Sequence, residues 1–307
     1  MISMSKLFYS AKKLLEIIDS GQAANIFEAT VAYEEELTGR TREEILEEMK
    51  KRYGVMKDAI KTVMENPQDI KTKVGTPTTP VIKEAIENSL SGLLNSEVVL
   101  KANLYAIAVM ECNASMGRIV AAPTAGSAGI LPGSMLAIQE HKNLSDDQIV
   151  EGLFVAAGIG LIIAAKSTFS AAKAGCQAEV GSSSSMSAGA LAYLQGLDTR
   201  GSLVASALSL QNMLGLACDP VGGLVEIPCI KRNGFGVSNA FLACDLASMG
   251  VVAEIPFDEV VDSMNNVAEN MHSNIRETAK GGLAVTPTAL RLYKEYLEKK
   301  KQKLRAK

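Results

Sequence analysis

Tryptophan is absent from this 307-residue sequence, and aromatic residues make up only 5% of it. Large rings therefore cannot fill most of the interior, and the many alanine, glycine, serine and methionine residues must do so instead. Small side chains allow helices to approach one another closely, which favours packed helices over a β-sandwich or barrel. Strand-like alternation of polar and apolar residues is also sparse. The sequence therefore predicts a mainly α protein.

Histidine is scarce too, because only His141 and His272 occur. Two histidines that lie in no recognisable motif argue against Ser-His-Asp and Cys-His triads, H-E-x-x-H zinc sites and multi-histidine metal sites. We interpret both as surface or capping residues. The phosphate-binding fingerprints are missing as well, since the glycines at Gly126 and Gly129 are not followed by Lys-Ser/Thr and no clear strand precedes them.

A large charge imbalance and a membrane-length apolar run are also missing. The net charge is −3, and no nucleic-acid-binding motif occurs, so no nucleic-acid partner is expected. The most apolar window, residues 152–165, is shorter than the roughly 20 residues that span a bilayer, so we expect a buried helix and no membrane association. The first residues lack the pattern of a secretory signal. We expect a soluble, cytoplasmic protein.

Several helix boundaries can be predicted from local signals. Capping boxes occur at Thr41–Glu44 and at Ser145–Gln148, and Thr286-Pro287 has the N-cap and first-position pattern of a helix start. An amphipathic pattern around Lys12–Ile17 predicts a short first helix. Periodicity predicts further helices over residues 81–94, 96–116, 186–195, 202–215, 238–250 and 258–271.

Between these helices lie long segments that are rich in glycine, serine and proline but poor in charge. Residues 123–133 contain two prolines and three glycines, and a turn with Asp219-Pro220 and Gly222-Gly223 separates two cysteines. We expect such segments to be irregular, because proline and glycine interrupt regular structure. Loops of this composition are typical of places where backbone approaches a ligand or another segment closely.

The five cysteines fall into two groups. Cys112 and Cys244 lie in predicted helices, where packed core thiols are expected. Cys176, Cys218 and Cys229 lie in predicted loops rich in glycine. In a reducing compartment a disulfide framework is not expected. The three loop thiols leave three interpretations open: a zinc site without its fourth ligand, a redox pair with a bystander, or three ligands of an iron–sulfur cluster, because no tight C-x-x-C spacing selects one.

Four long motifs carry a family resemblance. They occupy residues 116–133, 175–181, 218–233 and 276–288. In this order they resemble the alpha chain of iron–sulfur-dependent L-serine dehydratase, and the resemblance extends over essentially the whole chain. It implies a single, mainly helical catalytic domain over residues 1–307, with peripheral helices in 1–95 and the cluster- and substrate-binding core in 96–307.

The resemblance also implies a cofactor and a reaction. Cys176, Cys218 and Cys229 match the three cysteines that bind a 4Fe–4S cluster in the family. With three cysteine ligands, one iron of the cluster has no protein ligand. Such an iron is a Lewis acid for the β-hydroxyl of L-serine, which is converted to pyruvate and ammonia without pyridoxal phosphate. The family's second part, a beta chain or a fused domain, is absent here, so a beta-chain partner is expected.

Two departures from the family pattern are visible. The chain ends in Arg-Ala-Lys, so a terminal cysteine that reaches the cluster in single-chain relatives has no counterpart. Residues 182–185 are four serines, where relatives often carry an alanine or a cysteine among the serines. We predict that these serines either hydrogen-bond cluster sulfides or substrate, or form a helix N-cap.

Candidate substrate ligands follow from the chemistry of the loops. Amides and hydroxyls of Thr124, Gly126 and Ser127 can form an anion-binding nest for the substrate carboxylate, or this loop merely packs against the cluster segment. Lys231 and Arg232 are a second candidate, with a solvated or subunit-facing pair as the alternative. No residue is assigned as the base that removes the α-proton, and the partner chain is a potential source of it.

Two other functions remain open. A cluster-dependent L-cysteine desulfidase would use a related site to eliminate sulfide instead of water. A non-catalytic, metal-stabilised or metal-free binding protein would keep the scaffold without the chemistry. Colour and iron content distinguish a binding protein from an iron–sulfur enzyme. The amino acid that is consumed distinguishes a cysteine desulfidase from a serine dehydratase.

Overall fold

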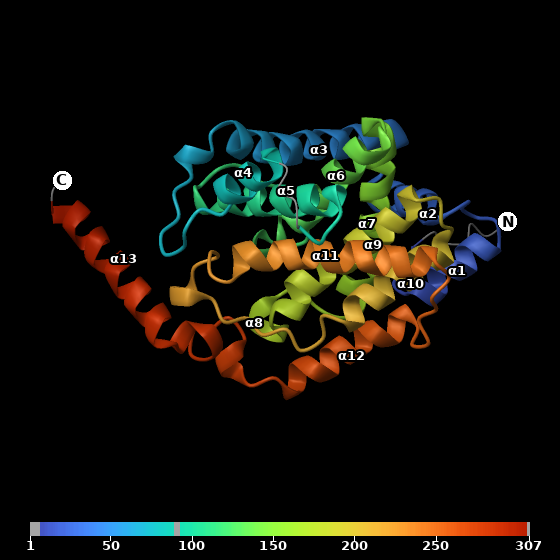
Figure 1. Cartoon of the computed structure of the whole chain (residues 1–307). Helices are drawn as coiled ribbons and strands as arrows, with labels where there is room; N and C mark the ends of the chain where they lie inside the picture. Colours follow the sequence, from blue (N-terminus) through green and yellow to red (C-terminus); the bar gives the residue numbers. More distant parts are fainter. Residues whose placement is uncertain (1–6, 89–92, 306–307) are drawn as a thin grey trace.

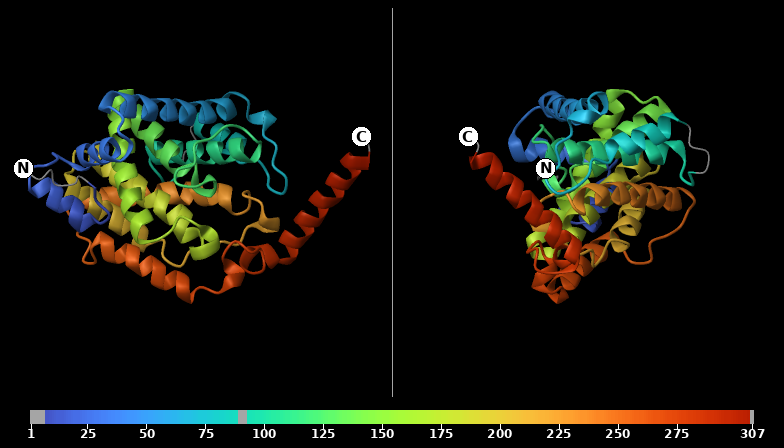
Figure 2. Two further views of the ribbon diagram at one scale, coloured as in Figure 1. Left: turned by 180° about the vertical axis from the view of Figure 1, so that it is seen from behind. Right: turned by 60° about the vertical axis from the view of Figure 1, so that its left-hand side comes forward.

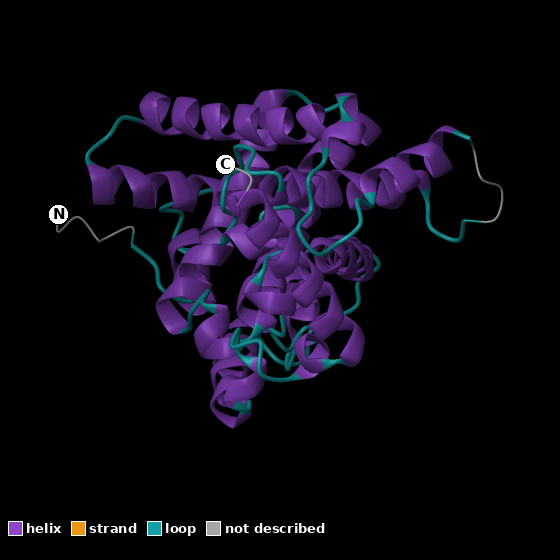
Figure 3. Ribbon diagram, turned by 90° about the vertical axis from the view of Figure 1, so that its left-hand side faces the viewer, coloured by secondary structure: helices purple, strands orange, loops and turns teal. Residues whose placement is uncertain are grey.

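The computed structural model describes residues 7–88 and 93–305, and over these ranges the protein is mainly α, as predicted (Figures 1 and 3). The described residues contain no β-strand, only an isolated parallel bridge between Cys218 and Arg276. The helices are α1 (Ala11–Asp19), α2 (Ile26–Thr38), α3 (Arg42–Glu65), α4 (Thr79–Glu87), α5 (Glu97–Ala114), α6 (Ile130–Lys142), α7 (Asp146–Lys166), α8 (Ala171–Ala174), α9 (Ser182–Leu194), α10 (Thr199–Gln211), α11 (Cys229–Ser248), α12 (Phe257–Asn270) and α13 (Pro287–Arg305).

Helix α9 lies at the centre and packs against α6, α7, α10 and α11. It can do so because its residues are small, which allows four neighbouring helices to approach its backbone. A Cβ added at Gly189 would lie 2.1 Å from Ile159 Cδ1 on α7, so no larger residue fits there without movement. The richness in alanine, glycine and serine is thus explained by close helix packing.

The apolar helix α7 is part of this core. Its capping box at Ser145 and Gln148 is present as predicted. By length and composition α7 is the one described helix that could cross a membrane, but 67% of its most apolar window is buried inside the protein. Burial of this kind is typical of a core helix.

Three segments that were predicted to be irregular are helical at one end. Helix α11 begins at Cys229, nine residues before the predicted start at 238, and α9 begins at Ser182 instead of 186. The glycines in the first turns of α11 led to the prediction of a loop there. Gly236 is instead required by helix packing, because a Cβ there would lie 2.6 Å from Ile130 Cδ1. Helix α6 begins at Ile130 and includes Pro132 in its first turn, where proline is tolerated because the N–H groups of a first turn have no partner within the helix.

Other boundaries differ less. Helix α4 ends at Glu87, and residues 89–92 of the predicted helix 81–94 lie outside the described ranges. Helix α10 ends at Gln211, short of the predicted 215, and the capping box at Thr41 and Glu44 is confirmed.

The last helix, α13, extends away from the body of the molecule (Figures 1 and 2). It starts at Pro287 with Thr286 as its cap, as predicted, because Thr286 Oγ1 accepts a hydrogen bond from Ala289 N at 3.4 Å. At its base Tyr293 packs on Gly222, where a Cβ would lie 2.2 Å from the ring. Helix α13 therefore contacts the turn between Cys218 and Cys229.

Close packing at Gly129 gives a test of the fold. A Cβ at Gly129 would lie 2.2 Å from the backbone oxygen of Ala106, which cannot move aside as a side chain could. We expect Gly129→Ala to lower the free energy of unfolding in urea by about 1–3 kcal/mol. Gly54→Ala is the matched control, because no atom of the described residues lies within 4 Å of its added Cβ, and alanine is favoured over glycine in a helix by about 0.5–1 kcal/mol. Equal stability of the two variants would contradict this packing.

Candidate metal centre

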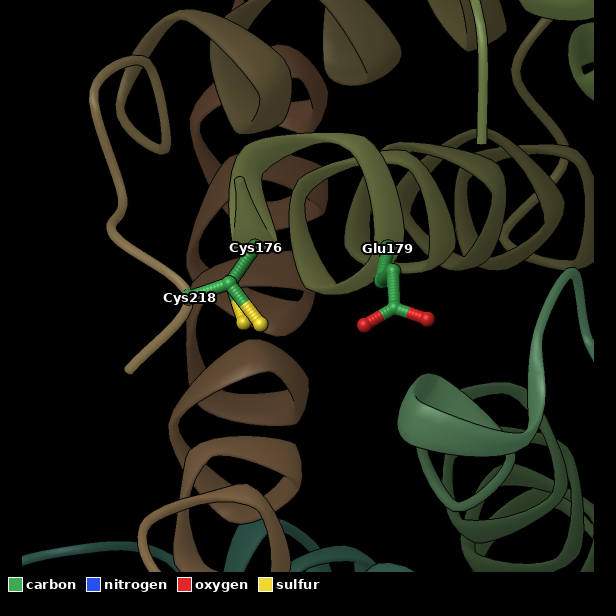
Figure 4. A group of neighbouring side chains, drawn as sticks. All are labelled: Cys176, Glu179 and Cys218. Carbon is green, nitrogen blue, oxygen red and sulfur yellow. The ribbon is translucent and has the colours of Figure 1, made fainter. Parts of the chain in front are cut away.

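Two of the three predicted cysteine ligands lie side by side. The sulfur atoms of Cys176 and Cys218 and a carboxylate oxygen of Glu179 are all within 4.8 Å of one another. In Figure 4 the two sulfurs are adjacent, and the Glu179 carboxylate is directed to the same side from the helical segment that carries Cys176. Cysteine sulfur and carboxylate oxygen are both ordinary metal ligands. This group is the candidate metal centre.

Cys176 was predicted in a loop, but it stands at the head of a helical segment. A π-helical turn, Gln177–Gly181, follows it directly and continues into α9. The extra residue of a π turn changes the direction of the side chains around it, and such turns are frequent at functional sites. Gly175, with φ of +70°, gives the sharp entry that a residue with a Cβ would strain.

Cys218 is fixed through its backbone by a segment far along the chain. Its N–H donates to Ile275 O at 2.8 Å, and its carbonyl accepts from Glu277 N at 2.8 Å. Glu277 and Ala279 in that segment have φ of +62° and +54°, which is unusual for residues other than glycine. The segment around residues 275–283 therefore forms one wall of the centre.

The turn between Cys218 and Cys229 is closed by its own backbone and by a second contact. Val221 N donates to Ile227 O at 2.9 Å. The buried carboxylate of Glu226 accepts hydrogen bonds from the backbone N–H groups of residues 73–75 at 2.8–3.1 Å. Charge-assisted bonds of this kind are the stronger ones, so the linker before α4 stabilises this turn.

Cys229, also predicted in a loop, is the first residue of α11 and is buried. It is not a member of the 4.8 Å group. Burial and, next, the charge of the neighbouring Cys176 together raise the pKa of Cys229 to about 12, so the two sulfurs interact electrostatically. Asn233, one turn along α11, donates to both Cys229 O and Gly126 O at 2.9 Å. The first turn of α11 is thereby bonded to the segment 124–129.

The Cys176 and Cys218 thiols share a hydrogen bond. Cys218 donates to Cys176, which lowers the pKa of Cys176 and raises that of Cys218. The Arg232 guanidinium also lowers the pKa of Cys176. Three buried sulfurs cannot all ionise beside a single guanidinium without further positive charge, because burial penalises each thiolate.

Glu179 is the functional candidate that sequence reasoning missed. Its carboxylate lies against Gly126, where an added Cβ would be 2.8 Å from Oε2 and 3.0 Å from Oε1. Burial raises the pKa of Glu179, a hydrogen bond from Thr124 opposes this, and the negative charge of Glu277 adds to it. The available signal was an acidic residue three positions after Cys176 in a segment otherwise poor in charge.

Comparison with known proteins places this chain in a family. The family model described as serine dehydratase alpha chain matches residues 22–284. The chain belongs to the serine dehydratase alpha chain family. It is 40% identical over 289 residues to a probable L-serine dehydratase alpha chain of Bacillus subtilis, with 94% of this chain and 95% of the relative covered.

Two further relatives extend the picture. An L-serine dehydratase alpha chain of Peptoniphilus asaccharolyticus is 45% identical over 202 residues, which cover 66% of this chain and 69% of the relative. An L-serine dehydratase of Helicobacter pylori is 41% identical over 211 residues, 67% of this chain but only 46% of its own length. The Helicobacter pylori relative is thus longer than the part that this chain matches.

The predicted carboxylate-binding loop of this alpha chain lies beside the centre. Thr124 is half-buried and hydrogen-bonds Glu179, while Gly126 lies under the Glu179 carboxylate. Ser127 is fully buried, and its hydroxyl lies 3.1 Å from Thr124 Oγ1. The structure therefore brings these three residues together with Cys176 and Cys218.

The second predicted pair is divided between two places. Arg232 Nη1 lies 3.7 Å from Cys176 Sγ, so Arg232 is part of the centre. Lys231 is exposed and lines a groove of about 410 Å³ between α4, α5 and α11, together with Phe235. Adjacent residues on a helix face different directions, which separates the two side chains.

The four serines do not cap α9. Gly181 is the N-cap and makes no side-chain capping bond, and Ser182 to Ser185 form the fully buried first turn. Three of them bond backbone carbonyls of other segments, Ser183 to Ala122, Ser184 to Gly236 and Ser185 to Ser206. The N-cap interpretation was wrong, because Ser182 is already the first residue of α9 and the π turn Gln177–Gly181 leads directly into it.

The remaining candidates behave as expected for structural residues. Cys112 and Cys244 are buried in α5 and α11, and each is about 3% exposed. His272 Nδ1 accepts a hydrogen bond from Asn274 N at 3.1 Å, which is a capping contact. His141 lies in the last turn of α6, where a basic residue complements the helix dipole.

Proposed function

We propose that this chain catalyses the deamination of L-serine to pyruvate and ammonia. The observation that carries the proposal is the convergence of the Cys176 and Cys218 sulfurs with the Glu179 carboxylate beside the segment 124–127. A group of buried thiols supplies a site for a metal centre, and the carboxylate supplies a base. L-Serine as substrate follows the names of the relatives, of which the Bacillus subtilis protein is matched nearly end to end.

For the cofactor we propose a 4Fe–4S cluster on Cys176, Cys218 and Cys229, with no pyridoxal phosphate. The donor set fits this group, because three free, buried cysteine sulfurs interact with one another and the Arg232 guanidinium by itself cannot neutralise three thiolates. Cysteine thiolates are the usual ligands of such clusters. When bound by only three cysteines, the cluster offers a Lewis-acidic iron to the β-hydroxyl of L-serine.

The residues of the chain supply the remaining chemistry. We propose that Glu179 removes the α-proton of L-serine and that the loss of the β-hydroxyl leaves an aminoacrylate, which hydrolyses to pyruvate and ammonia. The backbone of residues 124–127 and the Thr124 hydroxyl bind the substrate carboxylate. Ser127 orients Thr124 through their hydrogen bond, since Ser127 itself is fully buried.

We propose a beta chain as partner. The names of the alpha-chain relatives imply a second chain, and the Helicobacter pylori relative has additional sequence beyond the matched part. The experiment should therefore use this chain co-expressed with the beta chain of the same operon or genome, and the chain alone for comparison.

The test is anaerobic purification followed by analysis. We expect brown protein with about four irons and four sulfides per chain, which releases pyruvate from L-serine and bleaches in air. Release of sulfide from L-cysteine at a higher rate than pyruvate from L-serine would indicate a desulfidase. Colourless protein containing zinc or no metal, and without turnover of either amino acid, would contradict the proposed function.

A further inference from the structure

Arg232 contacts all three segments that carry the candidate ligands. Its side chain is 17% exposed and projects from the first turn of α11, three residues after Cys229. Nη1 lies 3.7 Å from Cys176 Sγ and donates to Ala217 O at 2.7 Å, next to Cys218. One guanidinium thus links Cys176, the backbone before Cys218 and the helix that begins at Cys229.

The other end of the guanidinium is fixed by Asp219. Arg232 Nη2 lies 2.9 Å from Asp219 Oδ1, and this carboxylate is almost fully buried. Its second oxygen accepts a hydrogen bond from Leu283 N at 2.7 Å. Gly282, with φ of +61°, allows this approach, because a Cβ there would lie 2.3 Å from Asp219 Oδ2. The wall segment, Asp219 and Arg232 form one continuous network.

These contacts leave little of Arg232 for a substrate. A planar guanidinium has donors in a fixed fork, and here one side faces a sulfur and a carbonyl while the other faces a carboxylate. To present its fork to a substrate carboxylate, Arg232 would have to release the buried Asp219 carboxylate, which would then be left without its charge partner. Arg232 is therefore placed to donate a hydrogen bond to the Cys176 sulfur and not to bind a substrate carboxylate.

We infer that Arg232 is a positioning residue for the centre. It keeps the three cysteine-bearing segments in register, and it donates a hydrogen bond to the Cys176 sulfur that raises the reduction potential of the bound group. This inference rests on the proposed function, since it concerns the proposed cluster. Hydrogen bonds to the sulfurs are one of the determinants of cluster potential.

The test uses the anaerobically purified complex with Arg232→Met and Arg232→Lys. The midpoint potential of the cluster is measured by a redox titration followed by electron paramagnetic resonance. We expect a lower potential in Arg232→Met and an intermediate one in Arg232→Lys, because lysine keeps the charge but cannot bridge sulfur and carboxylate as the fork does. The KM for L-serine is expected to stay within about twofold, since substrate contacts are kept.

Arg200→Met is the matched control, because Arg200 is exposed on α10 and, among the described residues, its ion pair is with Asp19 at 2.8 Å. It should leave the potential unchanged. If Arg232→Met loses iron and Arg232→Lys keeps it, the result supports the positioning role. The midpoint potential of Arg232→Lys is then compared with that of the wild type.

Two results would overturn the inference separately from the function. An unchanged potential in both Arg232 variants, with full iron content, would remove the sulfur-directed role. A KM for L-serine that is raised tenfold or more, with an unchanged potential, would show that Arg232 binds the substrate instead. A wild-type complex without iron would instead overturn the proposed function, and this inference with it.

Discussion

Replacement of Cys218 by serine is expected to abolish iron binding and L-serine turnover together. Serine keeps the size and the backbone bonds of Cys218 to Ile275 and Glu277, so the fold is retained. Its hydroxyl does not ionise near neutral pH as a thiol next to a metal does, so it cannot replace a thiolate ligand. Iron and sulfide per chain, the absorbance of the purified complex and pyruvate formation measure the loss.

The control is a cysteine of the same burial outside the centre. Cys244 lies on α11, the same helix as Cys229, and is about 3% exposed. Cys244→Ala should keep full iron content and lose only stability, by the cost of a small cavity. If Cys218→Ser kept the iron of the wild type while Cys244→Ala lost it, our assignment of the ligands would be wrong.

The pairing of Cys176 with Cys218 at one site could be predicted from the sequence, but the local structure around the three loop cysteines could not. Glycine and proline around Cys176, Cys218 and Cys229 distinguished them from the two helical cysteines. The same glycines suggested loops, whereas Cys176 and Cys229 each stand at the head of a helix. Small residues occur both in loops and in closely packed helices. Only the position of a neighbouring helix, such as α6 next to Gly236, shows which of the two structures a glycine belongs to.

Residues that meet across the fold were harder to predict. Gly126 was selected as a backbone position near a ligand, and it does lie at the centre, but its neighbour Glu179 was not selected. The local signal of Glu179 was weak, a single acidic residue in a segment otherwise poor in charge, because its environment is set by contacts distant in sequence. Arg232 illustrates the same limit, since its pairing with Asp219 depends on the turn that brings α11 back to Cys218.

Helix periodicity, by contrast, was sufficient where caps were present. The starts of α3, α7 and α13 were predicted from Thr41, Ser145 and Thr286, whose side chains accept backbone hydrogen bonds as expected. A cap is a local interaction within four residues, so the sequence contains all of it.

Replacement of Glu179 by glutamine is expected to lower kcat by about 10²- to 10⁴-fold, the usual contribution of a positioned general base. Glutamine keeps the shape of the side chain against Gly126 and can still meet the Thr124 hydroxyl, so the site should remain assembled. Iron content should equal that of the wild type, because Glu179 is not one of the three proposed ligands. Steady-state kinetics with L-serine on the anaerobic complex, alongside the iron assay, separate the two effects.

Glu151→Gln is the matched control, because Glu151 is on α7 and hydrogen-bonds Tyr193 away from the cysteines. It should leave kcat and iron content unchanged. Loss of iron from Glu179→Gln would make Glu179 a metal ligand rather than a base. Full kcat with full iron would leave proton removal to the partner chain. Only a lower kcat at full iron content supports the role assigned here, because it requires a group that acts on the substrate and not on the metal centre.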